Sequence, residues 1–566
     1  MACDPPLAHF GASETEPQDP TARAFPKPLL ALKEGDAQAV PTVPSGDVCS
    51  LTASALSHST RPALAAAMVA AALSGCDLEW DKPNLSAPPP ESFVEARPHP
   101  APPISGGRDF AVKFGSKELT QLVERALDDN LDLAAAIARI TEADAQARIS
   151  SAAQWPAVSM TDIARRTRTP GTTINIGSAS SGFNPATSST STSSTTSTAR
   201  GRNFAFFQLG LTASYEMDFW GKNEYASMAA RILANVSRFD RDVVEISTVA
   251  AVLNAYFQVL TAQDRLVIAR QNVTIAQQVM DAINARLDVG VATVLDTSQQ
   301  QTILAQQQAS IPPLEQTLRQ TRNNLAVLLG QTPESMTIKG GSLTKLNFPR
   351  IAPGLPSEVL LRRPDVAEAE ARLASQEFSV LQARAAFFPS LTLTGLHGFQ
   401  SAFMRTLVTR PDAIAWQVAG TLAQPLLDGW NLQGQYDFQK GRYSELAALY
   451  RKQILTALSD TENALIAIRE TDRQIKFLSV AVTAARRALE AAEMTLREGT
   501  IDIVTLAQTQ TSYFQTQDEL AIARLSHFQA ATSLYQALGG GWGPTTREIE
   551  IARSNAAYEA DRGPWP

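Results

Sequence analysis

Histidine and cysteine side chains build most metal, redox and nucleophilic sites, and this chain contains few of either. The three cysteines are Cys3, Cys49 and Cys76, and none follows position 76, so a zinc or redox site built on cysteine is not available further along. No Ser, His and acid motif, phosphate-binding glycine loop or pair of metal ligands is present. The sequence therefore predicts neither an enzyme nor a cofactor. The histidines are scattered without metal-ligand spacing: His9, His58, His99, His397 and His527.

Cys76 has a sequence around it that predicts one defined chemistry, the lipidation of this residue. Arg61 precedes an apolar run from Pro62 to Leu73, which ends in Leu73-Ser74-Gly75-Cys76. A basic start, a short apolar segment and small residues before the cut are typical of an export signal. The ending resembles a bacterial lipobox, in which the Cys becomes the acylated first residue. We predict a lipoprotein signal at 58–75 and lipidation of Cys76; the alternative is a buried alanine-rich helix with an incidental Cys.

The segments on either side of this signal lack hydrophobic periodicity. Residues 1–57 are rich in Pro, Asp and small residues, and we expect an unstructured extension there. Because such an extension would hinder export, the alternative is that translation begins further along the chain. Residues 76–107 hold the acylated Cys and a Pro-rich tether.

The composition excludes several classes of protein. A hydrophobic fraction of 44% beside 19% charged residues excludes a chain that is disordered throughout. A formal net charge of −7 differs from the basic charge typical of nucleic-acid-binding proteins, so the composition does not indicate a nucleic-acid partner. No uninterrupted apolar run approaches the ~18–20 residues of a membrane-spanning helix. Any membrane association must therefore come from a lipid anchor or from β-strands.

A long heptad pattern organises the rest of the chain. Apolar residues recur at every seventh position from Val252 to Leu287, with a second, alanine-rich seam from Ala255 to Ile283, and Gly290 ends the pattern. Aligning Gly290 with Gly499 reproduces both seams further along, so the helix occurs twice. A helix of ~65 residues is roughly 100 Å long, a length suited to reaching across a distance.

Strand-like alternation precedes each long helix. Helical periodicity from Ser116 gives way to segments at 157–163 and 207–215, and aligning Pro156 with Pro389 finds segments at 391–394 and 414–421. Alternating apolar and polar residues fit a barrel strand with its apolar face to lipid, and fit a half-buried soluble strand equally well. Between the first two segments, residues 187–198 are all Ser or Thr, which predicts a solvent loop. Aromatic residues in 215–222 suit a membrane–water boundary.

Two motifs carry a resemblance that spans the chain from the lipobox to about Gly541. They are Gly354-Leu355-Pro356-Ser357-Glu358-Val359-Leu360-Leu361-Arg362-Arg363-Pro364-Asp365-Val366 and Ala383-Arg384-Ala385-Ala386-Phe387-Phe388-Pro389-Ser390-Leu391-Thr392-Leu393-Thr394-Gly395. Shorter ones support them at 290–296, 311–314 and 324–330. The chain resembles the TolC-like outer-membrane ducts of tripartite efflux pumps, in the lipoprotein branch.

The resemblance implies a fold and a set of partners. The expected fold is mainly α with membrane β-strands: long coiled-coil hairpins form a periplasmic α-barrel, and four strands per protomer contribute to the β-barrel of a homotrimer. Expected partners are a periplasmic adaptor protein, an inner-membrane pump and outer-membrane lipid. The function implied is a passive exit duct anchored in the outer membrane of a Gram-negative bacterium. The alternative is a structural or docking coiled-coil protein of the periplasm.

The resemblance also implies where the gate and the adaptor-binding turns lie. Turns at Gly290 and Val291 and at Gly499 and Thr500 correspond to the periplasmic tip, where the adaptor docks. Asp296 matches an acidic family position, and acidic rings at a narrow mouth favour cations. The second hairpin departs from the family, which weakens the expectation of a strong acidic ring there. Its expected gate residues are Asp502, Val504, Thr505 and Gln508; for every tip residue the alternative is a solvated turn.

The predicted domain boundaries follow from these patterns. After the tether, a first structural repeat covers 108–330, a linker at the equatorial region covers 331–354, and a second repeat covers 355–541. Residues 542–566 form a C-terminal tail.

Overall fold

The computed structural model describes residues 80, 82–83, 90, 92–93, 106–169, 202–336, 338–351, 355–498 and 500–542. The chain divides into two units, 1–78 and 79–566, and every described residue belongs to the second. The predicted signal, Cys76, the Ser/Thr run, Gly499 and nearly all of the predicted tail therefore lie outside the described residues.

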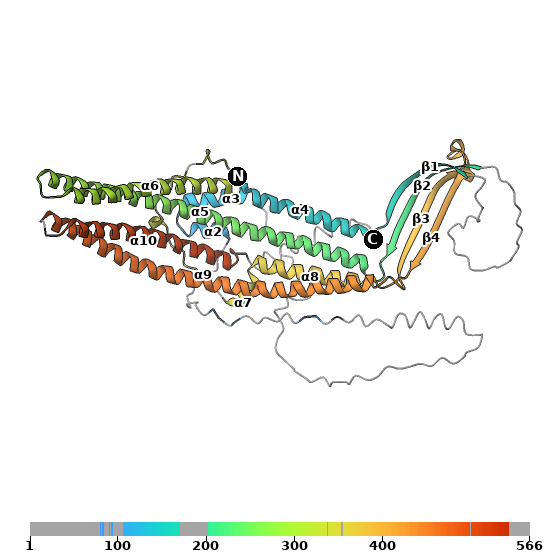
Figure 1. Cartoon of the computed structure of the whole chain (residues 1–566). Coiled ribbons are helices and arrows are strands. Elements are labelled where there is room, and N and C mark those ends of the chain that lie inside the picture. The colour runs from blue at the N-terminus through green and yellow to red at the C-terminus, as the bar shows by residue number, and fades with distance from the viewer. Residues whose placement is uncertain are drawn as a thin grey trace, which may run out of the picture. The chain divides into compact units, whose positions relative to one another are not determined.

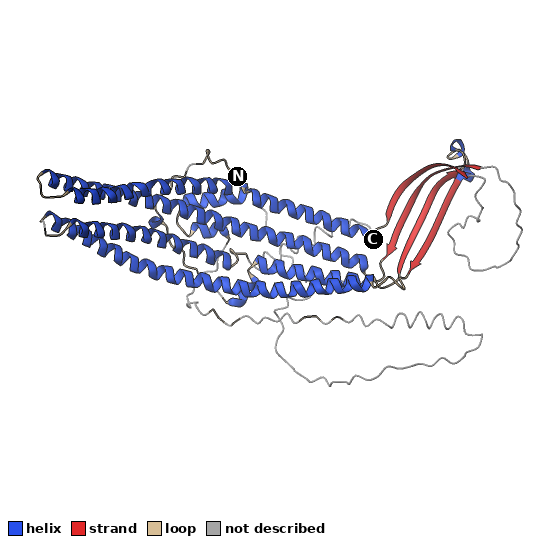
Figure 2. Cartoon of the chain, in the orientation of Figure 1, coloured by secondary structure: helices blue, strands red, loops and turns tan. Residues whose placement is uncertain are grey.

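Each repeat consists of helices, two strands and a long helical hairpin (Figures 1 and 2). The first comprises α2 (Gly107–Val112), α3 (Lys117–Asp129), α4 (Leu131–Ser151), η1 (Ala152–Gln154), β1 (Ala157–Thr169), β2 (Arg202–Met217), α5 (Lys222–Asp288) and α6 (Val294–Leu328). The second comprises α7 (Pro356–Leu361), α8 (Pro364–Ala385), β3 (Ser390–Ser401), η3 (Met404–Thr406), η4 (Pro411–Ala413), β4 (Ile414–Ala423), α9 (Asn431–Arg497) and α10 (Ile503–Ala537). The turn η2 (Leu343–Lys345) lies in the linker between them. The expected fold class, mainly helical with four strands, is confirmed.

The two long helices α5 and α9 each span 67 residues, so each is about 100 Å long. At the end remote from the strands, α5 turns back into α6 and α9 into α10; nearer the strands, α4 packs against α5 and α8 packs against both long helices (Figure 1). Both Pro312 and Pro313 lie inside α6, which continues through them.

Burial along α5 follows the predicted seams, with a drift. The alanine-rich seam is buried along its whole length, from Ala255 to Ile283. The other seam is buried from Val252 to Leu266 and half-buried from Val273 onward. A straight helix with 3.6 residues per turn rotates its face relative to a strict heptad, which accounts for the drift.

By length and composition alone, α5 also contains a stretch apolar enough to cross a membrane. Because 56% of that stretch is buried inside the structure, packing against neighbouring helices accounts for its hydropathy. Around the middle of α5, a cluster of aromatic side chains forms the main core. Its rings come from α2, α5, α10 and the segment after α2: Phe110, Phe114, Phe257, Phe528 and Tyr535.

The four strands form one antiparallel sheet in the order β1-β2-β3-β4. The central β2–β3 pairing joins the two repeats, with Leu211 opposite His397. Both β1 and β4 are edge strands of the sheet. The strands are longer than predicted: β1 continues beyond Ile163, through three arginines, because it stays paired with β2 to Thr169.

The two repeats make equivalent close contacts where a helix begins beside the end of a hairpin. Gly330, after α6, lies against the carbonyl oxygen of Asp129, and Gly539, after α10, lies against that of Arg362. Both glycines have positive φ, 64° and 80°. A Cβ at either position would overlap the carbonyl oxygen, so both the conformation and the space require glycine.

Candidate functional site

The turn of the first hairpin, residues 289–295, ends α5 and begins α6. Gly290 has φ 77°, and the amide of Val291 donates to the carbonyl of Arg286 at 2.9 Å, a bond that closes the end of α5. At the start of α6, the carboxylate of Asp296 accepts from the Thr293 amide at 2.7 Å and from its hydroxyl at 2.8 Å. The Asp296 amide donates to the Thr293 Oγ1 at 3.3 Å. Asp296 is therefore half of a capping box.

The turn of the second hairpin is built in the same way with the two cap residues exchanged. The Thr500 amide donates to the Thr495 carbonyl at 3.1 Å. Asp502 caps α10, and its Oδ1 accepts from the amide and hydroxyl of Thr505 at 3.0 and 2.5 Å. These hydrogen bonds, the one from the hydroxyl first, hold the pKa of Asp502 below its ordinary value. The alignment of the two hairpins pairs Thr293 with Asp502 and Asp296 with Thr505.

This exchange brings one carboxylate to the N-terminus of each returning helix, where the helix dipole favours negative charge. The position of the second hairpin that aligns with Asp296 holds Thr505, but a carboxylate is present earlier in the same turn, at Asp502. Asp296 is partly exposed, whereas Asp502, Thr505 and Gln508 are exposed. Val504 is 41% exposed.

The two turns differ in their apolar surface. In the first, four apolar side chains are exposed by 65% or more: Val289, Val291, Val294 and Leu295. In the second, Ile503 and Leu506 are buried, and the positions equivalent to Val289 and Val291 hold Glu498 and Thr500. Exposed apolar patches of this kind mark interaction surfaces.

A common core joins the two hairpins close to these turns. Its apolar side chains come from all four helices: Ala276, Val279, Ile283, Ile303, Leu489, Ala492, Ile503, Leu506, Tyr513 and Phe514. Within it, Gln300 and Gln510 are fully buried, and the Gln300 Nε2 donates to the Ala276 carbonyl at 3.0 Å and to the Gln510 Oε1 at 3.3 Å.

Two arginines of α5 reach across to the second hairpin. Arg286 donates from Nη1 to the Leu496 carbonyl at 2.8 Å, next to the turns. Arg265 donates from Nε and Nη2 to the two carboxylate oxygens of Asp518 in α10, at 2.6 and 2.9 Å. These contacts hold the hairpins together. No local sequence signal indicates them, because the partners lie far away along the chain.

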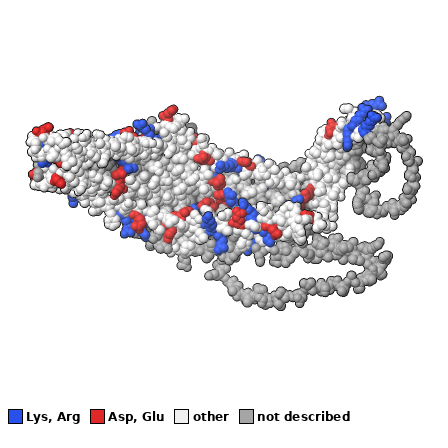
Figure 3. All heavy atoms as spheres, viewed as in Figure 1, with Lys and Arg blue, Asp and Glu red and all other residues white. Residues whose placement is uncertain are grey.

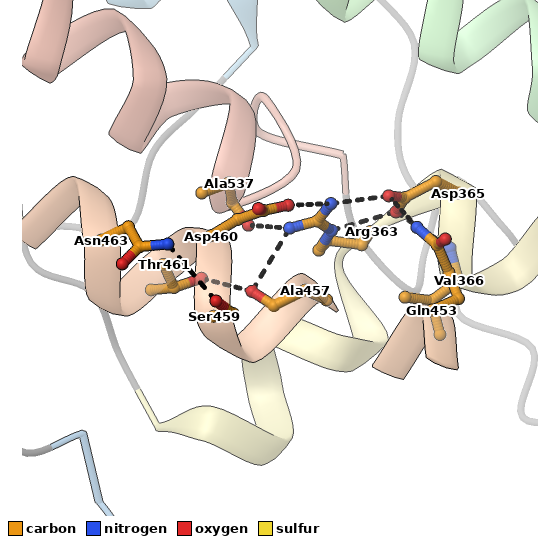
Figure 4. A network of polar contacts seen from close by, with 10 residues as sticks. All are labelled: Arg363, Asp365, Val366, Gln453, Ala457, Ser459, Asp460, Thr461, Asn463 and Ala537. Atoms are coloured by element: carbon orange, nitrogen blue, oxygen red, sulfur yellow. Dashed lines mark hydrogen bonds and ion pairs between the residues drawn. The ribbon is translucent and has the colours of Figure 1, made fainter. Parts of the chain in front are cut away.

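A buried arginine holds the second repeat together at the start of α8 (Figure 4). Arg363 Nε and Nη2 donate to the two carboxylate oxygens of Asp365 at 3.0 and 2.6 Å, and Nη2 lies 3.3 Å from Asp460. Its Nη1 donates to the carbonyls of Ala457 in α9 and Ala537 in α10. Arg363 and Asp365 belong to the motif at 354–366 that carries the family resemblance, and their contacts show that these two residues pack α8 against α9 and α10.

The strands have one apolar and one polar face. The registers put Met160, Leu211, His397 and Trp416 in one row across the sheet, flanked on the same face by a row that ends in Val418. On the opposite face, Ser159 and Thr161 contact Thr212 through their hydroxyls at 2.8 and 3.2 Å. Exposed tryptophans lie at the ends of the strands nearest the helices: Trp155, Trp220 and Trp430.

Comparisons with known proteins agree with this arrangement. The family model described as outer membrane efflux protein matches residues 122–331 and 355–540. The chain belongs to the outer membrane efflux protein family. It is similar to the pyoverdine export outer membrane protein OpmQ of Pseudomonas aeruginosa, with 34% identity over 81% of this chain and 92% of that protein.

Two further similarities cover almost the same length. The probable efflux pump outer membrane protein TtgC of Pseudomonas putida is 29% identical, over 89% of this chain and 100% of that protein. The solved structure of the outer-membrane channel OprN superposes with a TM-score of 0.72 at 25% identity, over 82% of this chain and 100% of that one.

The chain is an outer-membrane efflux channel, as the resemblance implied. Because it belongs to this family, the exit duct is favoured over the alternative of a structural or docking coiled-coil protein. Channels of this family are not enzymes. Among the described residues, no group of His, Cys, Asp and Glu side chains could hold a metal ion.

Proposed function

We propose that three copies of this chain close their sheets into one barrel and continue as a helical tunnel. The observation that carries the proposal is the four-stranded sheet with its two edge strands. In a membrane, unpaired edges leave backbone groups without hydrogen bonds, and four strands are too few to close a barrel. Three copies give twelve strands, with β4 of one protomer pairing antiparallel to β1 of the next.

Apolar side chains on the outer surface of the helices support the same assembly. Along α9 they point away from their own protomer's core, with exposures between 48% and 71%: Phe438, Leu449, Leu455, Phe477, Val480 and Met494. Burial of such a stripe against the next protomer would continue the coiled-coil packing seen within each hairpin.

The tips of the hairpins dock a periplasmic adaptor, through which an inner-membrane pump supplies the energy for export. The first turn is the principal contact, since Val289, Val291, Val294 and Leu295 expose their apolar side chains there. Gly290 has open space beside it, which leaves room for a partner's backbone. The turn at Gly499 and Thr500 contributes the polar part of the contact.

The gate lies at the same end of the tunnel. Threefold symmetry turns Asp296 and Asp502 into two acidic rings, with Val504 as the apolar constriction and Thr505 and Gln508 lining the approach. The arginine contacts from α5 to α9 and α10 hold the closed arrangement, since opening requires one hairpin to move against the other.

The lining of the barrel places little restriction on the solute. Apart from Arg165 and Glu216, the described side chains on the polar face carry no charge and are mainly Ser, Thr and Gln, so passage depends on size more than on charge. This neutrality is consistent with a family whose members include an exporter of pyoverdine. Acylation of Cys76 anchors each protomer to the outer-membrane lipid.

The test is the mass and stability of the assembly purified in detergent. We expect a particle of three chains that persists in mild detergent and that dissociates in the variants Val480→Lys and Phe477→Lys, which place a charge in the stripe on α9. A monomer that stays soluble without detergent would contradict the proposal.

A further inference from the structure

Arginines gather at the end of the sheet remote from the helices (Figure 3). Three lie on β1, namely Arg165, Arg166 and Arg168, and two lie in the β3–β4 connection, Arg405 and Arg410. All five side chains are exposed. Within the part of the chain that the structure describes, none of the five has an ion-pair partner. An uncompensated positive cluster is an anion-binding surface.

The register of β1 places two of these arginines on the apolar face. Side chains alternate along a strand, and β1 pairs with β2 without interruption, so Arg166 and Arg168 share the face of Val158 and Met160. Arg165, the neighbour of Arg166 in the chain, projects from the polar face instead.

The apolar band on this face ends where the arginines begin. On β2 it runs from Met217 to Phe207, a length of about 33 Å along the strand, which corresponds to roughly 25 Å of membrane at the usual tilt. That height matches the apolar band of an outer-membrane barrel. On β1, Asp162 interrupts the band opposite Leu209. Arg166 is two residues beyond Ala164, the partner of Phe207, so in the proposed barrel its guanidinium would lie at the level of the outer headgroups.

We propose that Arg166 and Arg168 bind the phosphate groups of lipid headgroups in the outer leaflet of the outer membrane. Guanidinium groups bind phosphate through two parallel hydrogen bonds, and their strength increases beside apolar surface. Because the barrel has three copies of β1, it carries three such sites. The assignment rests on the proposed barrel, which turns the apolar face toward lipid.

The proposed lipid site on the apolar face can be distinguished from a site for exported solutes, which would lie on the polar face. An anionic solute inside the barrel would meet Arg165, which lies opposite Phe206 on the polar face. Arg165 and Arg166 are thus neighbours in sequence that face different compartments, and each serves as a control for the other.

The experiment uses the full-length protein in detergent and fluorescent lipid A as the probe, with both phosphates present or both removed. We expect the wild type to bind the phosphorylated lipid more tightly, with a preference that weakens as salt increases. The double variant Arg166→Gln/Arg168→Gln should lose about tenfold in affinity for the phosphorylated lipid alone. Arg165→Gln should bind as the wild type does.

The proposal is overturned if the wild type binds both lipids equally, or if Arg165→Gln loses as much affinity as the double variant. Conductance of the same samples in phosphatidylcholine bilayers distinguishes this failure from failure of the channel. A wild type that conducts but ignores the phosphates contradicts only the lipid site. A wild type that never conducts contradicts the barrel and the lipid site together.

Discussion

Asn130 and Arg363 occupy equivalent positions in the two repeats and make the same hydrogen bond. Asn130 precedes α4 and donates to the carbonyl of Leu328 at 2.8 Å; Arg363 precedes α8 and donates to the carbonyl of Ala537 at 3.2 Å. The alignment of the two strand regions relates the donors, and the alignment of the two hairpins relates the acceptors. In both repeats, a buried side chain ties a strand-side helix to the last turn of a hairpin.

Removal of the arginine should therefore destabilise the fold. Arg363→Ala removes the hydrogen bonds to the Ala457 and Ala537 carbonyls and leaves the partly exposed Asp365 and Asp460 without their cation, which should cost roughly 1.5–3 kcal/mol. Arg363→Lys keeps the charge but loses the paired geometry, so its cost should be smaller. Urea unfolding in detergent measures both. The matched control is Arg362→Ala, whose ion pair with Glu358 is exposed and long, at 3.7 Å; an equal loss in that variant would contradict the account.

Alanine at Gly539 should be more damaging than alanine at Gly290. Both glycines have positive φ, 80° and 77°, so both substitutions add backbone strain of about 1–2 kcal/mol. At Gly539 the new Cβ would also overlap the carbonyl oxygen of Arg362, whereas at Gly290 it meets nothing within 4 Å. In thermal unfolding, the melting temperatures of Gly539→Ala and Gly330→Ala should be well below that of Gly290→Ala. Equal melting temperatures would show that the close contact has no energetic role.

The bidentate contact between Arg265 and Asp518 should restrain movement of the hairpins. Each single variant, Arg265→Ala or Asp518→Ala, should raise the open probability of the channel, because the contact joins α5 to α10. The double variant should do little more than either single one, with a coupling of about 1 kcal/mol for a partly exposed pair. Single-channel recording supplies the measurement, and additive effects would show that the residues act independently.

His527 should make the stability of the helical region depend on pH. It stacks on Phe348 at 3.9 Å, and its Nδ1 lies 2.9 Å from the Thr471 hydroxyl. Burial lowers its pKa, although the nearby Asp472 opposes the change. Since the unfolded chain then binds the proton more readily, stability should be highest above the ordinary pKa near 6.5 and should fall at lower pH.

The matched variant for this effect is His527→Gln, which keeps a polar side chain without a titration in this range. Urea midpoints between pH 7.5 and pH 5 should decline more steeply for the wild type than for the variant. Parallel declines would assign the pH dependence to other groups.

Local sequence signals sufficed to predict the long helices. The heptad seams and Gly290 predicted where α5 ends, and the structure ends it at Asp288. The outer part of β1 could not be predicted in the same way. Arg165, Arg166 and Arg168 interrupt the apolar alternation there, and the strand continues because β2 is paired with it along its whole length.

Contacts between distant parts of the chain could not be predicted from the sequence either. Nothing around Arg363 in the sequence indicates Ala457, Asp460 or Ala537 as its partners, because each lies far along the chain in α9 or at the end of α10. The exchange of Asp and Thr between the two caps was not among the predictions from the sequence, which placed Asp502 among the gate residues. The sequence showed Asp502 as a nearby acid, and the structure adds its role as a helix cap.

The most direct test of a gated outer-membrane duct is single-channel conductance of the detergent-purified protein in planar bilayers, beside Asp296→Ala and Gln508→Asp variants. The account predicts a small, mostly closed conductance that both substitutions change, since both alter the charge at the narrow mouth. A protein that is soluble without detergent and never conducts would contradict it.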